Sequence, residues 1–320
     1  MTFCIKKYIV RLEEAKFLKE NLHFALQKGK KMKTAVITDS NSGISQEEAK
    51  ELGLIVVPMP FLIDGQDYLE GIDLGRDEFY KRLLDGADVS TSQPSSFSVQ
   101  EIFDNTLKTY DEIVYIPTSS ALSNSCETGM ALAENYGGKI QVVDNKRISV
   151  LEKRSAIDAV KLAKEGKSAK EIKDYLMSTK ENASIYIMLT TLKYLKKGGR
   201  LTPAAALIGT MLSIKPILTI QGGKLDKFAQ ALGVNLGKRK MLEQVEKELS
   251  GRFKEQVEKG KLSVSVAYTY DKARAEDFKN EVEKQFEKYN VKVDFVDELS
   301  LSIACHTGEN ALAIALCETL

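Results

Sequence analysis

Short apolar runs alternate with helix-like segments through the first half of the chain, and this alternation limits the possible folds more than any other feature. Four such runs read as buried strands: Thr34–Thr38, Leu54–Val57, Ile113–Ile116 and Lys139–Val143. The segments between them are suited to the long crossover connections that parallel strands require. Strands of this kind predict a parallel sheet with helices on both faces. The expected fold class of this half is therefore α/β, with three α/β/α layers.

The second half of the chain has a different pattern. Two apolar runs flank Gly222-Gly223, which predicts a hairpin rather than a crossover. Further strands are predicted at Ser184–Leu189, Leu262–Tyr268 and Val291–Val296, and helices at 236–259, 271–289 and 308–318. A hairpin combined with crossovers predicts a mixed sheet in a two-layer α/β domain. We place the domain boundary near residue 180, which gives domains at 32–180 and 181–320.

Residues 1–31 are predicted to be an N-terminal extension that is helical or only partly ordered. The segment is rich in lysine, but Glu13, Glu14 and Glu20 interrupt it and no continuous apolar stretch follows, which argues against a secretory signal. Its apolar residues fall loosely on one helical face. Met32-Lys33 then leads directly into a strand, so an appended helix and an upstream translation start remain alternatives.

Composition and absent motifs exclude several functions. The net charge of +1 does not predict binding to nucleic acid, and no apolar run approaches the ~20 residues that stable insertion in a membrane requires. Four scattered cysteines without a CxxC pair, and only two histidines, predict no metal site and reduced thiols, hence a cytoplasmic protein. The phosphate-binding and hydrolase motifs GxxxxGK[ST], GxGxxG and GxSxG are missing, and no carboxylate pair stands out. We therefore expect a binding protein without a cofactor, not an enzyme that acts alone.

Two turns are rich in hydroxyl side chains, and the second of them follows the predicted strand Ile113–Ile116. One is Ser90–Ser96; the other follows Pro117 and contains Thr118, Ser119, Ser120, Ser123 and Ser125, with a predicted helix from Leu122 to Asn135. Hydroxyl groups and the free N–H groups of a helix start can hold an anion, and ligands bind at the carboxyl ends of strands in α/β sheets. Such residues also commonly cap helices and form turns, so one turn alone would not indicate a ligand.

Two later residues are candidates for the same site. His306 lies in the segment Ser302–Gly308, between an apolar region and the predicted last helix, where a structural and a functional role are about equally favoured. Arg200 follows Lys196-Lys197-Gly198-Gly199. That pattern is typical of a cationic helix C-terminus with glycine, and the alternative is a cationic site for a phosphate or a partner protein.

Six segments of the sequence resemble the DegV family, the fatty-acid-binding proteins that include the FakB subunits of bacterial fatty acid kinase. They occur in the family's order across 33–320: Thr38-Asp39-Ser40, Thr91-Ser92-Gln93-Pro94, Ser119-Ser120-Ala121-Leu122-Ser123, Lys197-Gly198-Gly199-Arg200, Ile214-Lys215-Pro216-Ile217 and His306-Thr307-Gly308. The resemblance implies two α/β domains, of the DegV and dihydroxyacetone-kinase type, with one long-chain fatty acid buried between them. In relatives a partner kinase phosphorylates the bound acid, and the acyl phosphate enters phospholipid synthesis.

The resemblance also implies the residues of the site. Thr91 and Ser123 match the positions that hydrogen-bond the fatty-acid carboxylate, and His306 matches the histidine of the head-group network. We include Ser92 and Asn124, their neighbours in the two turns, in the same predicted carboxylate-binding set. Arg200 matches an arginine that lies near the kinase-docking side in relatives.

The sequence departs from the family pattern at two places. Relatives usually read LSGTY where this chain has Leu122–Cys126; Asn124 stands at the glycine position and tolerates positive φ better than most residues. Relatives also tend to have a glycine-rich SxGLG stretch where Val150–Ile157 stands. The charged residues of that stretch are expected to reshape the acyl tunnel or the domain interface.

Two further functions are alternatives to a kinase-coupled fatty-acid carrier. One is a small-ketone-binding subunit of a kinase, with His306 bonding a dihydroxyacetone-like substrate. The other is a degenerate DegV-like lipid-binding protein without a kinase partner.

Overall fold

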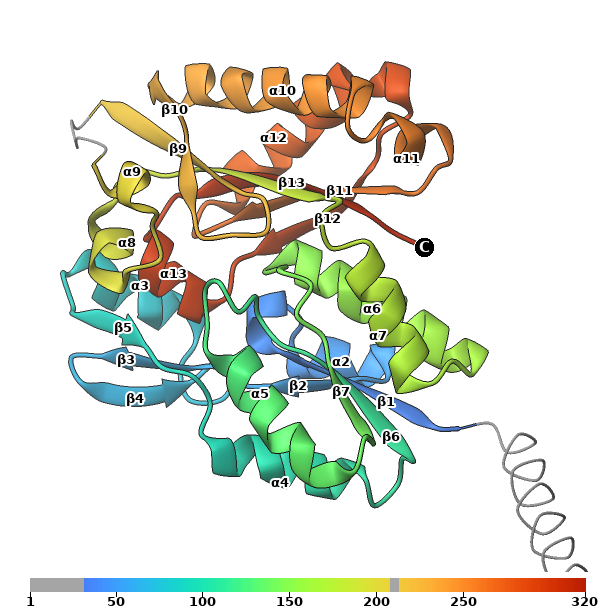
Figure 1. Cartoon of the computed structure of the whole chain (residues 1–320). Coiled ribbons are helices and arrows are strands. Elements are labelled where there is room, and N and C mark those ends of the chain that lie inside the picture. Colours follow the sequence, from blue (N-terminus) through green and yellow to red (C-terminus); the bar gives the residue numbers. More distant parts are fainter. Residues whose placement is uncertain (1–31, 208–212) are drawn as a thin grey trace, which may run out of the picture.

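The computed structural model describes residues 32–207 and 213–320, so the predicted extension at 1–31 lies outside the described residues. Two main sheets lie one above the other in Figure 1, with the amino-terminal strands in the lower one and the later strands in the upper one. The lower sheet draws its strands from residues 34–142 and the upper sheet from 183–318. The exact domain limits at 32–180 and 181–320 stay a prediction.

The lower sheet is the predicted parallel sheet. Its strand order is β2 (Ile55–Val57), β1 (Thr34–Asp39), β6 (Glu112–Ile116) and β7 (Ile140–Val142), and all pairs are parallel. Alternate side chains face opposite layers. One face packs on α2 (Gln46–Leu52), α6 (Val150–Glu165) and α7 (Ala169–Ser178), and the other on α4 (Ser96–Thr106) and α5 (Ser125–Ala133). The four predicted strands and the three layers are confirmed.

A small antiparallel sheet extends this half. It consists of β4 (Gln66–Leu69), β3 (Pro60–Ile63) and β5 (Val89–Thr91), with β3 in the middle. Its aromatic core packs against α3 (Arg76–Leu84) and against α13 (Leu301–Thr307) from the far end of the chain. Because β5 ends at Thr91, this sheet places the first hydroxyl-rich turn beside α13.

The upper sheet is mixed, as predicted. Its order is β10 (Asp226–Leu232), β9 (Ile214–Ile220), β8 (Ala183–Met188), β13 (Leu312–Glu318), β11 (Leu262–Tyr268) and β12 (Val293–Glu298). Only β11 and β12 pair in parallel, and the predicted hairpin is the antiparallel pair β9–β10. Helices α10 (Val234–Ser250) and α12 (Lys272–Gln285) cover the outer face. The inner face points toward the lower half of the molecule.

The predicted last helix at 308–318 is wrong. Residues Leu312–Glu318 form β13, a central strand of the upper sheet, and the helix lies just before it as α13. A short apolar run buried on both faces has no period that separates a strand from a buried helix. The predicted helix at 236–259 is likewise divided, into α10 and α11 (Lys254–Glu258), because the chain bends at Gly251 and buries Phe253.

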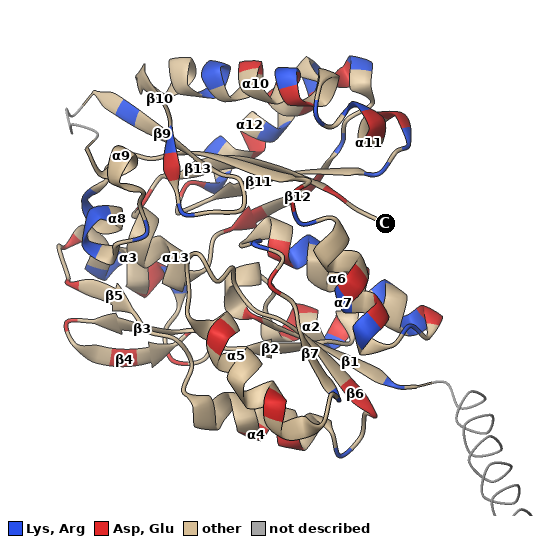
Figure 2. Cartoon of the chain, in the orientation of Figure 1, with Lys and Arg blue, Asp and Glu red and all other residues tan. Residues whose placement is uncertain are grey.

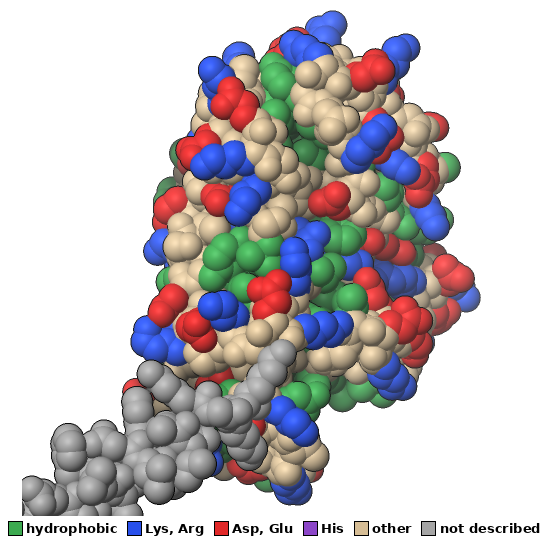
Figure 3. All heavy atoms as spheres, turned by 90° about the vertical axis from the view of Figure 1, so that its right-hand side faces the viewer, with side chains coloured by type: hydrophobic (Ala, Val, Ile, Leu, Met, Phe, Trp, Pro, Cys, Tyr) green, Lys and Arg blue, Asp and Glu red, His purple; other side chains and the backbone are tan. Residues whose placement is uncertain are grey.

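Charged residues lie mainly on the outer surfaces of the molecule. Lysine and arginine gather on α8 (Lys193–Gly198) and the turn after it, close to α9 (Pro203–Ala206) (Figure 2). The face in Figure 3 carries both signs of charge among apolar patches, in keeping with the net charge of +1. Within 32–207 and 213–320, no helix is long and apolar enough to cross a membrane.

Candidate functional site

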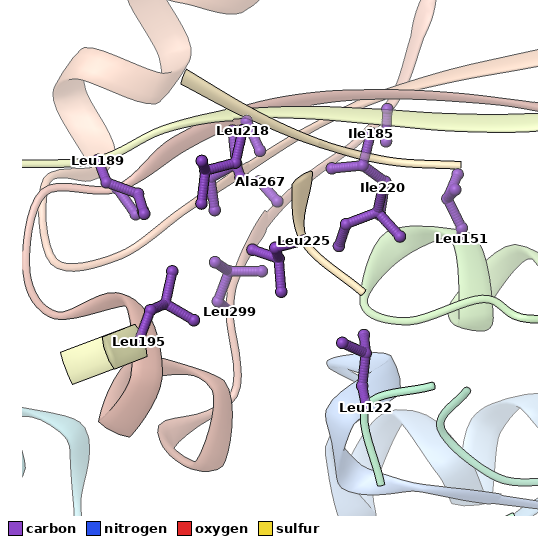
Figure 4. Packing of buried hydrophobic residues seen from close by; sticks show 14 of the residues in the cluster. Leu122, Leu151, Ile185, Leu189, Leu195, Leu218, Ile220, Leu225, Ala267 and Leu299 are labelled. Carbon is purple, nitrogen blue, oxygen red and sulfur yellow. The ribbon is translucent and has the colours of Figure 1, made fainter. Parts of the chain in front are cut away.

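A cavity of about 280 Å³ lies between the inner face of the upper sheet and the carboxyl ends of the lower strands. Part of its apolar wall comes from the strands of the upper sheet: Ile185, Ile187, Ile220, Ala267, Ala313 and Ala315. Leu122 and Leu151, from the lower half, face the same apolar cluster (Figure 4). The structure also brings all six predicted site residues to this cavity: Thr91, Ser92, Ser123, Asn124, Arg200 and His306. One end of the cavity is therefore rich in polar side chains, and the rest of its wall is mostly apolar.

His306 and Thr91 form a pair at the polar end. His306 Nε2 lies 2.9 Å from Thr91 Oγ1. The sequence predicted His306 just before the last helix, whereas it lies in the last turn of α13, because the helix here precedes residue 308 and a strand follows it. The pair joins the end of β5 to α13, residues that are far apart in the sequence.

The surroundings of His306 keep its ring neutral. Burial lowers the pKa of His306 to about 4, and the nearby positive charge of Arg200 acts in the same direction. Nδ1 is buried and has no hydrogen-bond partner among the described residues, and its neighbour is Gly198, where an added Cβ would overlap the ring. With the ring proton on Nε2, His306 donates to Thr91, whose own O–H is then free to donate to a ligand.

The second turn holds Ser123 at the same end. Ser123 Oγ lies 2.9 Å from Ser125 Oγ and accepts a hydrogen bond from the Ser125 backbone N–H. Asn124 has φ −78°. The turn therefore does not require a positive φ at this position, and the tolerance of asparagine for positive φ is not needed. Its side chain does not cap α5, which begins at Ser125 and not at the predicted Leu122. Asn124 and Ser92 are exposed, which places them at the mouth.

Other hydroxyl groups of this turn form turn contacts instead. Ser120 Oγ donates to Asp144 Oδ2 over 2.8 Å, and Ser119 Oγ accepts from the Ala121 backbone N–H. Neither residue lines the cavity. The interpretation of serines as turn formers therefore holds for these two residues, although Thr118 and Ser123 do line the cavity.

Arg200 links α8 to the second turn. Its Nε donates to the Leu122 carbonyl over 3.2 Å, and Nη1 donates to the Gly198 carbonyl. α8 itself ends at Gly199 in the left-handed conformation, with φ 69°, as the glycine pattern predicted. Arg200 is thus half-buried at the cavity, next to the exposed lysines of α8.

A buried carboxyl pair, Asp39 and Glu152, which did not stand out in the sequence, lies directly behind the polar end. Thr118 Oγ1 contacts Asp39 Oδ1 at 2.9 Å and Glu152 Oε2 at 3.2 Å, and Thr118 also lines the cavity. Thr38 Oγ1 contacts Glu152 Oε1 and the Ile116 carbonyl, both at 2.9 Å. Each hydroxyl has one proton for two acceptors, so a proton on a carboxyl group is needed to complete the network.

That proton belongs to Glu152. Asp39 accepts backbone N–H bonds from Asn41 and Thr118, which favour its charged form. Glu152 receives no backbone donor among the described contacts, and burial together with the Asp39 charge raises its pKa well above the usual value. Burial raises the pKa of Asp39 as well. The sequence offered no signal for this pair, since only the packing of α6 on β1 joins the two residues.

The departure at 150–157 affects two regions of the structure. Ile148, Ser149 and Val150 form part of the cavity wall at the start of α6. Lys153 instead forms ion pairs with Glu48 of α2, at 2.8 Å, and Asp297 of β12, at 2.7 Å. Lys153 thus points away from the cavity and strengthens the contact between the two halves, whereas Glu152 lies behind its polar end.

The comparisons with known proteins agree with this architecture. The model of the DegV family, described as an uncharacterised protein, matches residues 33–319. A DegV domain-containing protein of Clostridium perfringens is 31% identical over 290 residues, which cover 88% of this chain and 96% of that protein.

Solved structures are similar over most of their length. A stearic acid-binding protein from Eubacterium ventriosum has a TM-score of 0.79 and 26% identity, covering 89% of this chain and 98% of that chain. A DegV family protein from Thermus thermophilus, described for its fatty acid binding, has a TM-score of 0.78 and 25% identity, covering 90% and 100%. DegV from Bacillus subtilis, a fatty acid binding protein, has a TM-score of 0.76 and 26% identity, covering 90% and 100%. The family match, the identity to the clostridial relative and the shared fold together show that this chain belongs to the DegV family.

Proposed function

We propose that the chain binds one long-chain fatty acid in the cavity, with the carboxylate at the polar end and the hydrocarbon tail along the upper sheet. The observation that carries this proposal is the division of one cavity into a hydroxyl- and histidine-lined end and an apolar remainder. Burial of a hydrocarbon tail is favourable by ~0.8 kcal/mol per methylene, so the tail supplies most of the affinity. The polar end then determines the orientation.

The carboxylate is held by Thr91, Ser123 and His306, with Ser92 and Asn124 at the mouth. Hydroxyl donors suit this task because they hydrogen-bond an anion without the desolvation cost of a buried cationic side chain. Support also comes from the Eubacterium and Bacillus relatives, which are described as binding stearic acid and fatty acid, respectively.

The carrier presents the acid to a partner kinase and does not act on it alone. Ser92 and Asn124 are exposed at the carboxylate end, so a second protein can reach the head group there. Arg200 and the lysines of α8 give that side a positive charge that suits a partner handling phosphate. A cytoplasmic location follows from this role. If the proposal is right, acyl phosphate, trapped with hydroxylamine, forms from loaded protein and ATP only when a kinase is added.

Both alternatives lack a specific observation in their favour. A covalent ketone adduct needs a free ring nitrogen, but Nε2 of His306 contacts Thr91 and Nδ1 packs against Gly198. A degenerate protein is not indicated either, because the two departures leave the cavity open and its polar end complete.

Substitution of the two hydroxyl residues tests the site. Thr91→Ala and Ser123→Ala are each expected to weaken fatty-acid binding about tenfold or more, since a hydrogen bond to a charged group contributes roughly 1.5–3 kcal/mol. Affinity is measured by titration of delipidated protein with a long-chain acid.

Ser120→Ala is the matched control, because Ser120 lies in the same turn but outside the cavity wall. Its affinity should equal that of the wild type. Unchanged affinity in both Thr91→Ala and Ser123→Ala would remove these residues from the site.

A further inference from the structure

Three parallel rows of side chains cross the inner face of the upper sheet, and the cavity covers only part of them. The strand register defines the rows. The first is Ile187–Ala313–Ala267, the second is Ile185–Ala315–Ser265 and the third is Ala183–Cys317–Ser263, each running from β8 over β13 to β11. Successive rows are about 7 Å apart, since they are two residues apart along each strand.

The cavity ends at the second row. All three residues of the first row line it, only Ile185 and Ala315 of the second row do, and none of the third row does. Helix α6 closes this side: it packs on β11 and β13, and its Leu151 belongs to the same apolar cluster as Ile185 and Ile220. In Figure 4, Ile185 and Ile220 lie toward Leu151, whereas Leu195 of α8 lies on the other side of the cluster.

The head-group end is at the first row. His306 precedes β13 by a short connection, and α8 follows the end of β8, so both lie where β13 begins and β8 ends. A tail whose carboxylate is at Thr91 and His306 therefore passes over Ala313 and reaches Ala315 last.

The middle of each of the first two rows is alanine, whereas the β8 side is isoleucine. Ile185 and Ile187 are β-branched and stiff, so they form a fixed wall beside the alanines. Ala313 and Ala315 line the cavity with single methyl groups, and Ala315, which is 0% exposed, lies at its edge. A larger side chain at either position would occupy the space of the ligand tail.

We propose that Ala315 marks the methyl end of the acyl site and sets the longest straight-chain fatty acid that the protein accepts. This inference rests on the proposed function and adds the residue that determines chain length. A leucine at this position would displace the last methylenes of a long tail and leave a shorter tail undisturbed. The same change at Ala313 would block the tail near its head group and weaken binding of all lengths.

The test is a competition among straight-chain saturated fatty acids of increasing length. Delipidated full-length wild type and Ala315→Leu are incubated with an equimolar mixture, and the bound acids are identified by native mass spectrometry. We expect Ala315→Leu to bind the longest acid taken by the wild type about tenfold less, or weaker still, because displacing two methylenes costs about 1.6 kcal/mol. Shorter acids should be retained.

Controls separate the possible outcomes. Ala131→Leu, on the exposed side of α5, should leave the length distribution as in the wild type. A wild type that takes up no acid of any length contradicts the proposed function itself. A wild type that binds acids, with an unshifted distribution or equal weakening of all lengths in Ala315→Leu, contradicts this inference alone.

A second variant decides the matter if Ala315→Leu does not fold. Ile185→Ala removes bulk from the same row and from the cavity wall beside Ala315. It should shift the bound acids toward longer chains, and an unchanged distribution would overturn the inference.

Discussion

Two ionisable residues near the polar end of the cavity, His306 and Glu152, are held in their neutral forms. Burial lowers the pKa of the histidine to about 4 and raises that of the glutamate well above its usual value. Both effects have the same physical origin, since removal from water disfavours the charged form of either group. Thr91 therefore lies beside a neutral His306, and Thr118 beside a neutral Glu152. The negative charge of Asp39 is stabilised by the backbone N–H groups that donate to it.

The proton on Glu152 predicts a pH dependence of stability. Because its pKa is raised on folding, the protonated residue stabilises the fold fully below the ordinary glutamate value of 4.5, and this contribution is lost as pH rises above it. Glu152→Gln cannot ionise. Its free energy of unfolding, measured by urea denaturation, should therefore increase relative to the wild type between pH 5 and pH 8.

Asp39→Asn is the contrasting variant. Both oxygens of Asp39 accept hydrogen bonds, so the amide group of asparagine would place its N–H groups against a hydrogen-bond donor. We expect this substitution to lower the free energy of unfolding by roughly 1–3 kcal/mol. Parallel pH profiles for Glu152→Gln and the wild type would show that Glu152 is not the protonated member.

The individual residues of the candidate site were more predictable from the sequence than the buried residues that they contact. Thr91, Ser123 and His306 belong to short segments that resemble a family, and each lies close to the end of a strand or helix, where the fold gathers such ends. Asn41 and Glu152 carry no comparable signal, and Thr118 was indicated only as one hydroxyl of the second turn. Their roles arise from contacts between β1, β6 and α6, which no local pattern encodes.

At the scale of elements, the strongly alternating first half was predicted well and the last segment was not. Strands β1, β2, β6 and β7 are short apolar runs bounded by clear turns. β13 is equally apolar, but α6 packs on its inner face and α10 and α12 cover its outer face, so both faces are buried. Without an exposed face its sequence has no polar–apolar alternation, and the predicted helix at 308–318 followed from that.

Helix α6 provides a prediction about the contact between the two halves. Lys153 is 6% exposed in its side chain and lies between Glu48 and Asp297, so Lys153→Ala leaves two carboxylates facing each other. We expect the free energy of unfolding to fall by on the order of 2 kcal/mol. Breaking a fully buried ion pair costs roughly 3–5 kcal/mol, and the loss here is smaller because both carboxylates are partly exposed. Urea denaturation measures the difference.

Lys170→Ala is the matched control, since Lys170 pairs with Asp174 on the exposed face of α7. Exposed pairs of this kind contribute at most a few tenths of a kcal/mol, so the stability of this variant should stay close to that of the wild type. Equal losses in the two variants would mean that Lys153 does not join the halves.

At the scale of the whole molecule, the cavity exists because the two main sheets face each other with helices packed between them. The fold class of each half follows from its pattern of strands, but the relative placement of the halves does not. It depends on long-range contacts such as Ser300 with Asn41, at 2.7 Å, and Glu70 with the Leu301 backbone N–H, at 2.6 Å. These contacts position α13, and with it His306, over the ends of the lower strands.

If a fatty acid occupies the space between the two sheets, native mass spectrometry of the mildly purified wild-type chain will detect it. We expect an added mass equal to one long-chain fatty acid per chain, restored by feeding after delipidation. Protein that remains free of lipid even after incubation with long-chain acids would contradict this expectation.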